Sequence, residues 1–137
     1  MSPLFADTSF YIALISDGDA HHERAVELSK QYRRRQITTD YILVEAGNWF
    51  ARSNRAAFVQ LAADLSADPN TTILPATADL LAKACRLYAE RIDKEWSLTD
   101  CTSIIAMQEH GLTEALTTDH HFEQAGFRAL LREGGTP

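Results

Sequence analysis

The sequence lacks most of the features that mark secreted, membrane-spanning or cysteine–zinc proteins. Its 137 residues include two cysteines, Cys85 and Cys101, which form no CxxC pair and have no histidine at zinc-site spacing. We therefore expect both to be reduced, buried, small apolar residues of a cytoplasmic protein. No run approaches the ~20 apolar residues that a membrane helix needs, and the first residues lack the basic start of a signal peptide.

Basic charge is also scarce. The chain has 13 Lys and Arg against 19 Asp and Glu, a net charge of −6. A domain that coats nucleic acid electrostatically is usually basic, so this composition argues against that class, but not against an enzyme that reaches a phosphodiester through metal ions. We interpret the one run of three cations, Arg33 to Arg35, as the solvated end of a helix; contact with RNA phosphates is the alternative.

Short apolar strands alternate with helical patterns along the chain. Strands are expected at 3–7, 36–38, 71–74, 115–118 and 127–131, and helices at 8–15, 21–34, 40–52, 56–65, 78–92, 97–110 and 120–124. Helix 78–92 should turn Leu81, Tyr88 and Ile92 inward, and helix 97–110 should stop at Gly111. The alternation predicts one α/β domain over 1–132 with a short parallel sheet covered by helices on both faces, followed by a frayed tail at 133–137.

Four acidic residues stand out by their positions. Asp7 ends the first expected strand, and Asp119 directly follows strand 115–118. Asp100 lies in the first turn of helix 97–110, and Glu45 lies in the second turn of helix 40–52. Because sites in open parallel sheets form at the carboxyl ends of the strands, at least three of these acids should share one rim.

Three of the acids also have an ordinary explanation as helix caps. Asp100 completes an S-x-x-D capping box with Ser97, and Asp7 and Asp119 each precede an expected helix. Both explanations stay open for these three. Glu45 lies in the apolar run 41–46, where it has no capping role and no Lys or Arg at helical spacing. A buried carboxylate is costly unless it is paired or binds a metal, so capping explains Glu45 worst.

Clustered carboxylates indicate a divalent cation. Such groups repel one another unless a counter-charge is present, and Mg²⁺ prefers oxygen ligands. A bound metal would lower the pKa of a water molecule and support phosphodiester hydrolysis. We do not expect the pairs His21-His22 and His120-His121 to chelate metal, because adjacent side chains point in different directions. Trp49 is expected in the core or on a dimer surface.

Four segments carry a family resemblance: Phe5-Ala6-Asp7-Thr8-Ser9, Glu45 after Tyr-Ile-Leu-Val, Asp93 to Cys101 (DKEWSLTDC), and Leu116 to Asp119 (LTTD). In this order they resemble the PIN-domain ribonucleases, and among these the VapC-type toxins of toxin–antitoxin pairs. The resemblance runs from Leu4 to about Leu131. It implies a three-layer α/β/α sandwich, a homodimer, an RNA substrate, and an antitoxin whose C-terminal segment occupies the active-site groove.

The same resemblance implies roles for individual residues. It implies that Asp7 and Asp100 are the principal Mg²⁺ or Mn²⁺ ligands, and that Glu45 and Asp119 are further acids that bind metal directly or through water. It also implies that Ser9 and Thr118 are polar supports of the site and that Asp93 is an outer acid. For the two hydroxyl residues an ordinary place at a helix start or strand end remains equally open. For Asp93 a solvated loop position is the preferred interpretation.

Two other functions were weighed against a nuclease. A PIN-like domain that binds RNA or a protein without cutting is the main alternative, and the presence of all four acids argues against it. A phosphatase of the haloacid-dehalogenase type needs a second aspartate two residues after the first, where this chain has Ser9. The sequence thus favours a metal-dependent endoribonuclease that acts as a toxin.

Overall fold

The computed structural model describes residues 2–31 and 35–133, so Arg33, Arg34 and the tail from residue 134 lie outside the described residues. The strands are β1 (Leu4–Ala6), β2 (Gln36–Thr39), β3 (Thr71–Leu74), β4 (Glu114–Leu116) and β5 (Arg128–Ala129). The helices are α1 (Thr8–Ile15), α2 (His22–Gln31), α3 (Asp40–Phe50), α4 (Arg55–Ala67), α5 (Ala78–Glu90), α6 (Leu98–Glu109), α7 (His120–Gln124) and the 3-10 turn η1 (Leu130–Arg132).

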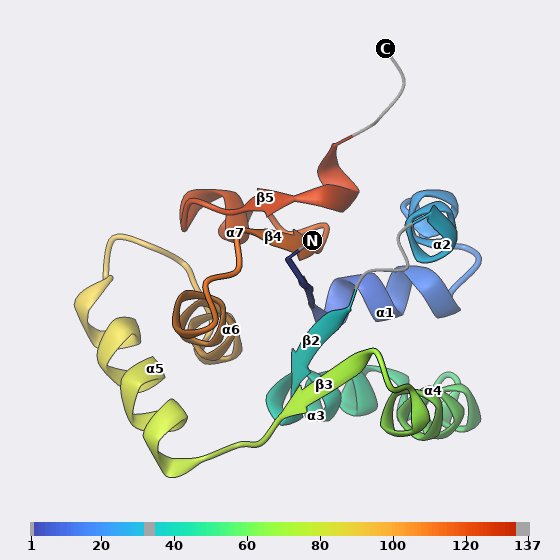
Figure 1. Ribbon diagram of the computed structural model, residues 1–137, viewed down its shortest axis with the longest axis horizontal. Coiled ribbons are helices and arrows are strands. Elements are labelled where there is room, and N and C mark those ends of the chain that lie inside the picture. Colours follow the sequence, from blue (N-terminus) through green and yellow to red (C-terminus); the bar gives the residue numbers. More distant parts are fainter. Residues whose placement is uncertain (1, 32–34, 134–137) are drawn as a thin grey trace.

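The five strands form one parallel sheet in the order β3-β2-β1-β4-β5. Helices α1, α2 and α4 lie on one side of this sheet and α5 and α6 on the other (Figure 1). The predicted α/β class and the three-layer α/β/α arrangement are therefore confirmed. No helix within residues 2–31 and 35–133 is long and apolar enough to cross a membrane.

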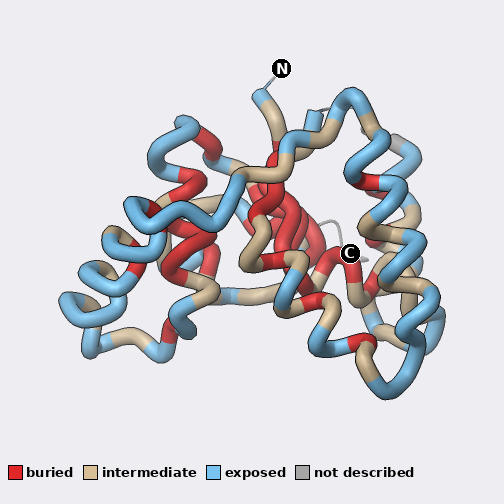
Figure 2. Tube along the Cα trace, turned by 90° about the horizontal axis from the view of Figure 1, so that it is seen from below, coloured by how far each residue is buried: buried red, intermediate tan, exposed pale blue. Residues whose placement is uncertain are grey.

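The central strand β1 is buried along its whole length. Phe5 and Ala6 have no exposed surface, and Leu4 is 2% exposed. Figure 2 shows this concentration of buried residues at the centre of the molecule, with exposed residues along the outer helices. Each fully buried large side chain of this kind contributes roughly 1.5–3 kcal/mol. This packing makes the carboxyl end of β1, where Asp7 follows, a rigid point of the fold.

Local signals start and stop the helix that follows the α5 segment. The Ser97 hydroxyl accepts a hydrogen bond from the Asp100 backbone N–H, and the Asp100 carboxylate accepts one from the Ser97 N–H, which is the expected capping box. The helix ends as predicted before Gly111, whose φ of +63° is a conformation that glycine adopts without strain. Asp100 is thereby held at a fixed place on the first turn of α6.

The exposed side of α5 contradicts several expectations. Leu81, Tyr88 and Ile92 are 39%, 53% and 91% exposed rather than turned inward, and Cys85 is exposed, so the expectation that both cysteines are buried is wrong. Helix α5 buries only a narrow stripe that includes Leu80 and Ala84. The helix also ends at Glu90, so the helical period does not extend to Ile92.

The strands near the carboxyl edge are shorter than predicted. Strand β4 ends at Leu116, so Asp119 does not directly follow it. Beyond the end of β4, the Thr117 carbonyl accepts a hydrogen bond from the Leu131 N–H at 3.2 Å. The last expected strand is reduced to β5 and continues as η1. Trp49, expected in the core or on a dimer surface, is 62% exposed and so does not lie in the core of this chain.

Candidate active site

An open cavity of about 400 Å³ lies beyond the carboxyl ends of β1 and β4. All four acids singled out from the sequence line it, although they come from four separate segments. The lining residues are Asp7, Thr8, Ser9, Ile12, Glu45, Trp49, Glu95, Ser97, Asp100, Asp119 and His121. The predicted rim is therefore a physical cavity, and it holds a fifth acid, Glu95, which the sequence analysis quoted within a motif without assigning it a role.

Asp7 is the most buried of these acids, with 6% of its surface exposed. It occupies the N-cap position of α1, but its side chain makes no capping hydrogen bond. Its Oδ2 instead accepts hydrogen bonds from the hydroxyls of Ser9 and Thr117, both at 2.8 Å. Of the two explanations that the sequence left open for Asp7, the ordinary cap does not hold.

Burial raises the pKa of Asp7 from 3.8 to about 6. The two hydroxyl hydrogen bonds oppose this shift, whereas the negative charges of Asp100 and Glu45 add to it. Because desolvation and like charges both disfavour the ionised form, the cavity destabilises the Asp7 carboxylate. A cation in the cavity would relieve both effects.

The hydroxyl that supports Asp7 from just beyond β4 belongs to Thr117, not to the expected Thr118. Thr117 is fully buried, and its hydroxyl accepts a hydrogen bond from the Asp119 N–H at 3.0 Å while it donates to Asp7. Thr118 contributes its backbone, because its N–H donates to the Ser9 hydroxyl at 3.0 Å. Two consecutive threonines are ambiguous in a sequence, and the early end of β4 decides which one faces Asp7.

Asp100 and Asp119 are both caps and members of the cavity. Besides closing its capping box, the Asp100 Oδ2 lies 2.9 Å from the Nδ1 of His121. The Asp119 carboxylate accepts a hydrogen bond from the His121 backbone N–H at 2.9 Å, which starts α7. The same His121 Nδ1 lies 3.3 Å from Asp119 Oδ1. His121 therefore links two of the acids, and the sequence analysis did not assign it this position.

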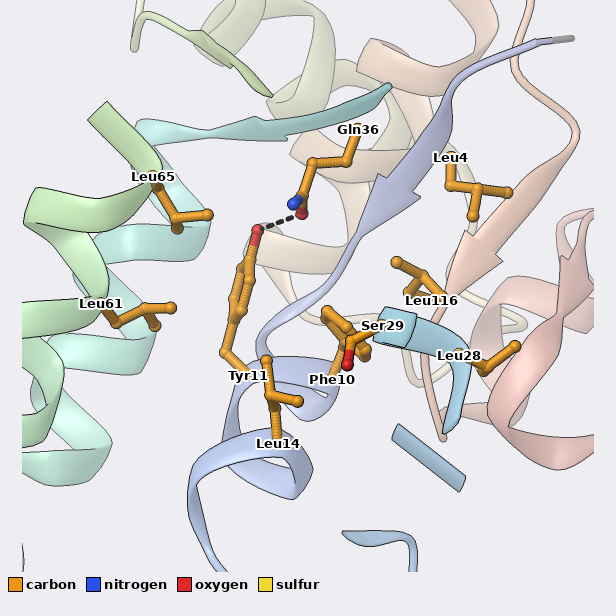
Figure 3. A pocket seen from close by; sticks show the side chains of 10 residues that line it. All are labelled: Leu4, Phe10, Tyr11, Leu14, Leu28, Ser29, Gln36, Leu61, Leu65 and Leu116. Atoms are coloured by element: carbon orange, nitrogen blue, oxygen red, sulfur yellow. Dashed lines mark hydrogen bonds between the residues drawn. The ribbon is translucent and has the colours of Figure 1, made fainter. Parts of the chain in front are cut away.

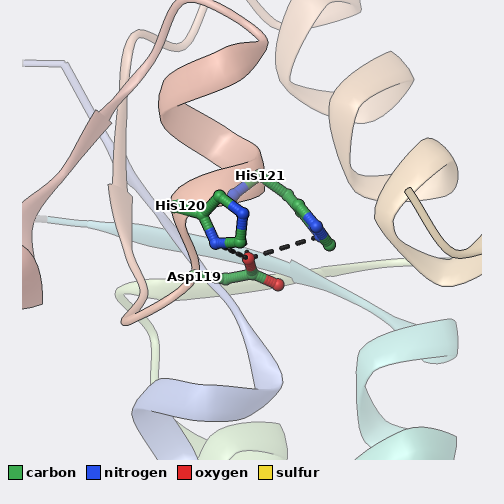
Figure 4. A group of neighbouring side chains, drawn as sticks. All are labelled: Asp119, His120 and His121. Carbon is green, nitrogen blue, oxygen red and sulfur yellow. Dashed lines mark hydrogen bonds and ion pairs between the residues drawn. The ribbon is translucent and has the colours of Figure 1, made fainter. Parts of the chain in front are cut away.

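The two histidines of α7 both lie beside Asp119 (Figure 4). The Nδ1 atoms of His120 and His121 lie 3.6 and 3.3 Å from the same oxygen, and the ring centroids are 4.5 Å apart. The ligand atoms of these three residues fall within 4.8 Å of one another, close enough to share a metal ion. The argument that adjacent histidines must point apart is thus wrong for this pair, while the prediction that they bind no metal stays a prediction.

Among the polar groups that line the cavity, those of Glu45 and Thr8 are at least partly buried and have no partner in the described part of the chain. The Glu45 carboxylate, half-buried on α3, makes no hydrogen bond or ion pair with any residue of 2–31 or 35–133. The hydroxyl oxygen of Thr8 is buried and has no hydrogen-bond partner there. Unsatisfied buried polar atoms are rare and call for a ligand, water or ion. Together with the surrounding carboxylates they form an oxygen-rich donor set that suits a hard divalent cation.

Asp93 does not line the cavity. Its carboxylate lies on the turn before α6, 58% exposed, and accepts two hydrogen bonds from the Arg91 guanidinium at 3.0 and 3.1 Å. The Arg91 side chain holds the pKa of Asp93 below its usual value. This position matches the preferred interpretation of Asp93 as a solvated loop residue.

Comparisons with known proteins identify the family of this chain. Residues 4–128 match the PIN domain family. The chain is 32% identical over 126 residues to the 23S rRNA-specific endonuclease VapC20 of two strains of Mycobacterium tuberculosis, covering 90% of this chain and 95% of the relative.

Solved structures give the same result. The crystal structure of Mycobacterium tuberculosis VapC20, described as a sarcin–ricin loop cleaving toxin, has a TM-score of 0.83 and 30% identity over 90% of this chain and 95% of that one. FitAcB from Neisseria gonorrhoeae shares the fold, with a TM-score of 0.64 and 22% identity over 92% and 94% of the two chains. The chain therefore belongs to the PIN-domain family and, within it, to the VapC-type ribonuclease toxins.

Proposed function

We propose that this protein is a metal-dependent endoribonuclease that hydrolyses RNA phosphodiester bonds as the toxin of a type II toxin–antitoxin pair. The observation that carries the proposal is the surroundings of Asp7. A buried carboxylate with a raised pKa lies in a cavity with four other acids, and no Lys or Arg in the described part of the chain lines that cavity. Such a cluster costs stability, which a metal-dependent reaction explains and a purely structural role does not.

Mg²⁺ is the proposed cofactor, with Mn²⁺ as an alternative, because carboxylates suit both ions. Asp7 and Asp100 are the proposed principal ligands. The hydroxyls of Ser9 and Thr117 occupy Oδ2 of Asp7, and the Ser97 N–H and His121 occupy Oδ2 of Asp100, so each carboxylate keeps its other oxygen for a ligand. When bound, the cation supplies charge neutralisation at the phosphate and lowers the pKa of a water molecule.

The other residues of the cavity divide the remaining work. To Glu45, which lines the cavity and has no partner of its own among the described residues, we assign the role of accepting the proton of the attacking water. Asp119 contributes negative charge and orients His121, whose ring holds Asp100 in turn. Ser9 and Thr117 keep the Asp7 carboxylate from rotating. In this scheme the hydrogen-bonded supports make the site rigid before substrate arrives.

The relatives suggest where to look for the substrate and partner. VapC20 is named for 23S rRNA and the sarcin–ricin loop, so a ribosomal RNA loop is the first substrate class to test here. We further propose a cognate antitoxin whose C-terminal segment occupies the acidic cavity, a homodimer, and action in the cytoplasm, where ribosomal RNA is located. An antitoxin segment that carries basic or hydrogen-bond-donating side chains would complement the carboxylates of the cavity.

The test is cleavage of purified ribosomal and total RNA by the protein in Mg²⁺, in EDTA, and with the Asp7→Asn variant. We expect discrete fragments only with wild type and metal, with ends that can be mapped to unpaired loops. Binding of RNA without cleavage in every condition would instead support the alternative of a silent RNA-binding domain. A protein that neither binds nor cleaves RNA in any condition would contradict both the nuclease proposal and the RNA-binding alternative.

A further inference from the structure

A second cavity of about 390 Å³ adjoins the acidic cavity. Glu95 and Ser97 line both, so the two spaces are separated by no more than the turn before α6. The other residues that line the second cavity are Tyr88, Arg91, Ile92, Lys94 and Trp96. A polymer bound with one phosphate among the acids must continue past one of the walls of that cavity, and this turn is one such wall.

Two cations line the second cavity together with Glu95, whereas no Lys or Arg of residues 2–31 and 35–133 lines the acidic cavity. These cations are Arg91 and Lys94, with side chains 40% and 27% exposed. The Arg91 guanidinium is held in place over the Trp96 ring, 5.0 Å from its centroid, by cation–π contact and by Asp93. The Lys94 ammonium makes one ion pair with the described residues, a long contact of 3.9 Å to Asp93. Lys94 can therefore reorient toward a phosphate with a smaller loss of existing contacts than Arg91.

The same turn exposes apolar and aromatic surface that the fold does not use. Ile92 is 91% exposed and Tyr88 53% exposed, and both line the second cavity. Trp96, in contrast, is buried and donates its indole N–H to Gln124. An exposed aromatic ring beside a cation that can reach the backbone is an arrangement with which proteins bind single-stranded nucleic acid, by stacking one base and contacting a phosphate.

We propose that the second cavity is a subsite for the nucleotide next to the scissile phosphate, with Tyr88 and Ile92 against the base and Lys94 against the neighbouring phosphate. The inference rests on the proposed function, because it requires an RNA strand in the acidic cavity. It explains how a protein of net charge −6 holds a polyanion beside five acids. A metal would neutralise one phosphate, and Lys94 would contact the next.

The charge part of the proposal is tested by the salt dependence of RNA binding. Fluorescence anisotropy is measured with a short single-stranded RNA that spans the mapped cleavage site, on the Asp7→Asn protein so that no cleavage occurs. Lys94→Gln should reduce the slope of log K against log salt by about 0.7, the value for one lost phosphate contact on a single strand. Arg86→Gln is the matched control, since Arg86 is exposed on α5 and lines neither cavity.

The stacking part is tested with Tyr88→Ala. We expect roughly tenfold weaker RNA binding, as for the loss of one base stacked on an aromatic ring, and no loss with Tyr88→Phe. Leu81→Ala, at another exposed apolar position of α5, should bind like the parent protein. The effect of Tyr88→Ala should vanish with an oligonucleotide that is abasic at the adjacent position and persist with one that is abasic elsewhere.

The outcomes separate this inference from the proposed function. If wild type cleaves RNA but Lys94→Gln and Tyr88→Ala behave like their controls, the subsite is wrong and the nuclease assignment stands. If wild type neither binds nor cleaves RNA, the proposed function is wrong, and the subsite inference that rests on it is wrong as well. A Tyr88→Ala protein with normal RNA binding but a changed mass by light scattering, or with lost neutralisation by a protein partner, would assign this face to a second copy or to a peptide and overturn the proposal.

Discussion

Two hollows beside α1 differ in whether their buried polar groups are satisfied by hydrogen bonds. One is the acidic cavity. The other is an apolar pocket of about 120 Å³ between α1, α2, α4 and the sheet (Figure 3). The residues that line the apolar pocket are Leu4, Phe10, Tyr11, Leu14, Leu28, Ser29, Gln36, Leu61, Leu65 and Leu116. Residues of α1 line both hollows, and only the acidic cavity holds the five carboxylates.

In the apolar pocket the buried hydroxyl has a partner. Tyr11 is 1% exposed, and its hydroxyl donates to Gln36 Oε1 at 2.9 Å. Asp7 lies one helical turn earlier on the chain, and burial disfavours its charged form despite two hydrogen bonds. Thr8, beside it, keeps an unpaired buried hydroxyl. Burial alone therefore does not identify a functional site. Such a site is indicated by buried polar groups whose hydrogen bonds do not offset the cost of desolvation.

The largest effect that sharpens this comparison is the loss of cleavage in Asp7→Asn. Removing a principal metal ligand should lower the cleavage rate at least ~1000-fold, since the charge stabilisation by a metal contributes several kcal/mol to the transition state. The measurement is the rate of cleavage of one defined RNA at saturating Mg²⁺. Asp17→Asn, at an exposed aspartate outside the cavity, should cleave at the wild-type rate, and equal losses in both variants would contradict the assignment.

The second prediction concerns the stability of the metal-free protein against pH. The folded-state pKa of Asp7, about 6, exceeds its unfolded value of 3.8. Its neutral form therefore favours folding below pH ~4, and this contribution is lost as pH rises through 6. About two pKa units correspond to roughly 3 kcal/mol.

Asp7→Asn should therefore match wild type near pH 4 in EDTA and be more stable by up to ~3 kcal/mol at pH 8. Urea unfolding at a series of pH values measures this difference. A wild-type protein that stays as stable as Asp7→Asn at pH 8 would show that Asp7 carries no burial cost.

The third prediction concerns His121, which positions Asp100. His121→Leu removes the group 2.9 Å from Asp100 Oδ2, and loss of a residue that orients a metal ligand typically costs 10–100-fold in metal affinity or activity. His121→Asn can keep a donor near that position and should recover most of the loss. Mg²⁺ affinity by calorimetry, besides the cleavage rate, is the measurement, and wild-type affinity in His121→Leu would rule out the positioning role.

The smallest effect tests the apolar pocket. Tyr11→Phe removes the hydrogen bond to Gln36 and should reduce the free energy of unfolding by about 1 kcal/mol, with the cleavage rate unchanged. Denaturant unfolding and the same RNA assay provide both numbers. A large loss of activity with normal stability would show that this pocket takes part in the reaction, and the contrast between the two hollows would fail.

Much of the fold was predictable because local patterns and layer rules agree. The alternation of strands and helices, the parallel sheet and the rim position of the acids follow from apolar spacing and from the geometry of parallel sheets. The capping box of Ser97 and Asp100 was also readable, because its two residues are three apart in the sequence. Features that depend on residues within one or two turns of the chain can therefore be predicted from the sequence.

The rest depended on tertiary contacts that no local pattern encodes. Thr117 and Thr118 are equivalent in the sequence, and the place where β4 stops decides which hydroxyl meets Asp7. His121 reaches Asp100 across 21 positions of sequence. On α5 the period of apolar residues was read as a wide buried face, whereas only the narrow stripe of Leu80 and Ala84 is buried.

The central claim is that the acidic cavity binds a divalent cation through Asp7, and thermal unfolding at pH 7.5 tests it most directly. Wild type, Asp7→Asn and Asp17→Asn are compared in EDTA and in Mg²⁺. Wild type and Asp17→Asn should gain stability with metal, by about 2.7 kcal/mol at 100 times Kd, and Asp7→Asn should gain little while starting from a higher melting temperature in EDTA. Equal gains in all three proteins, or none in any, would contradict the account.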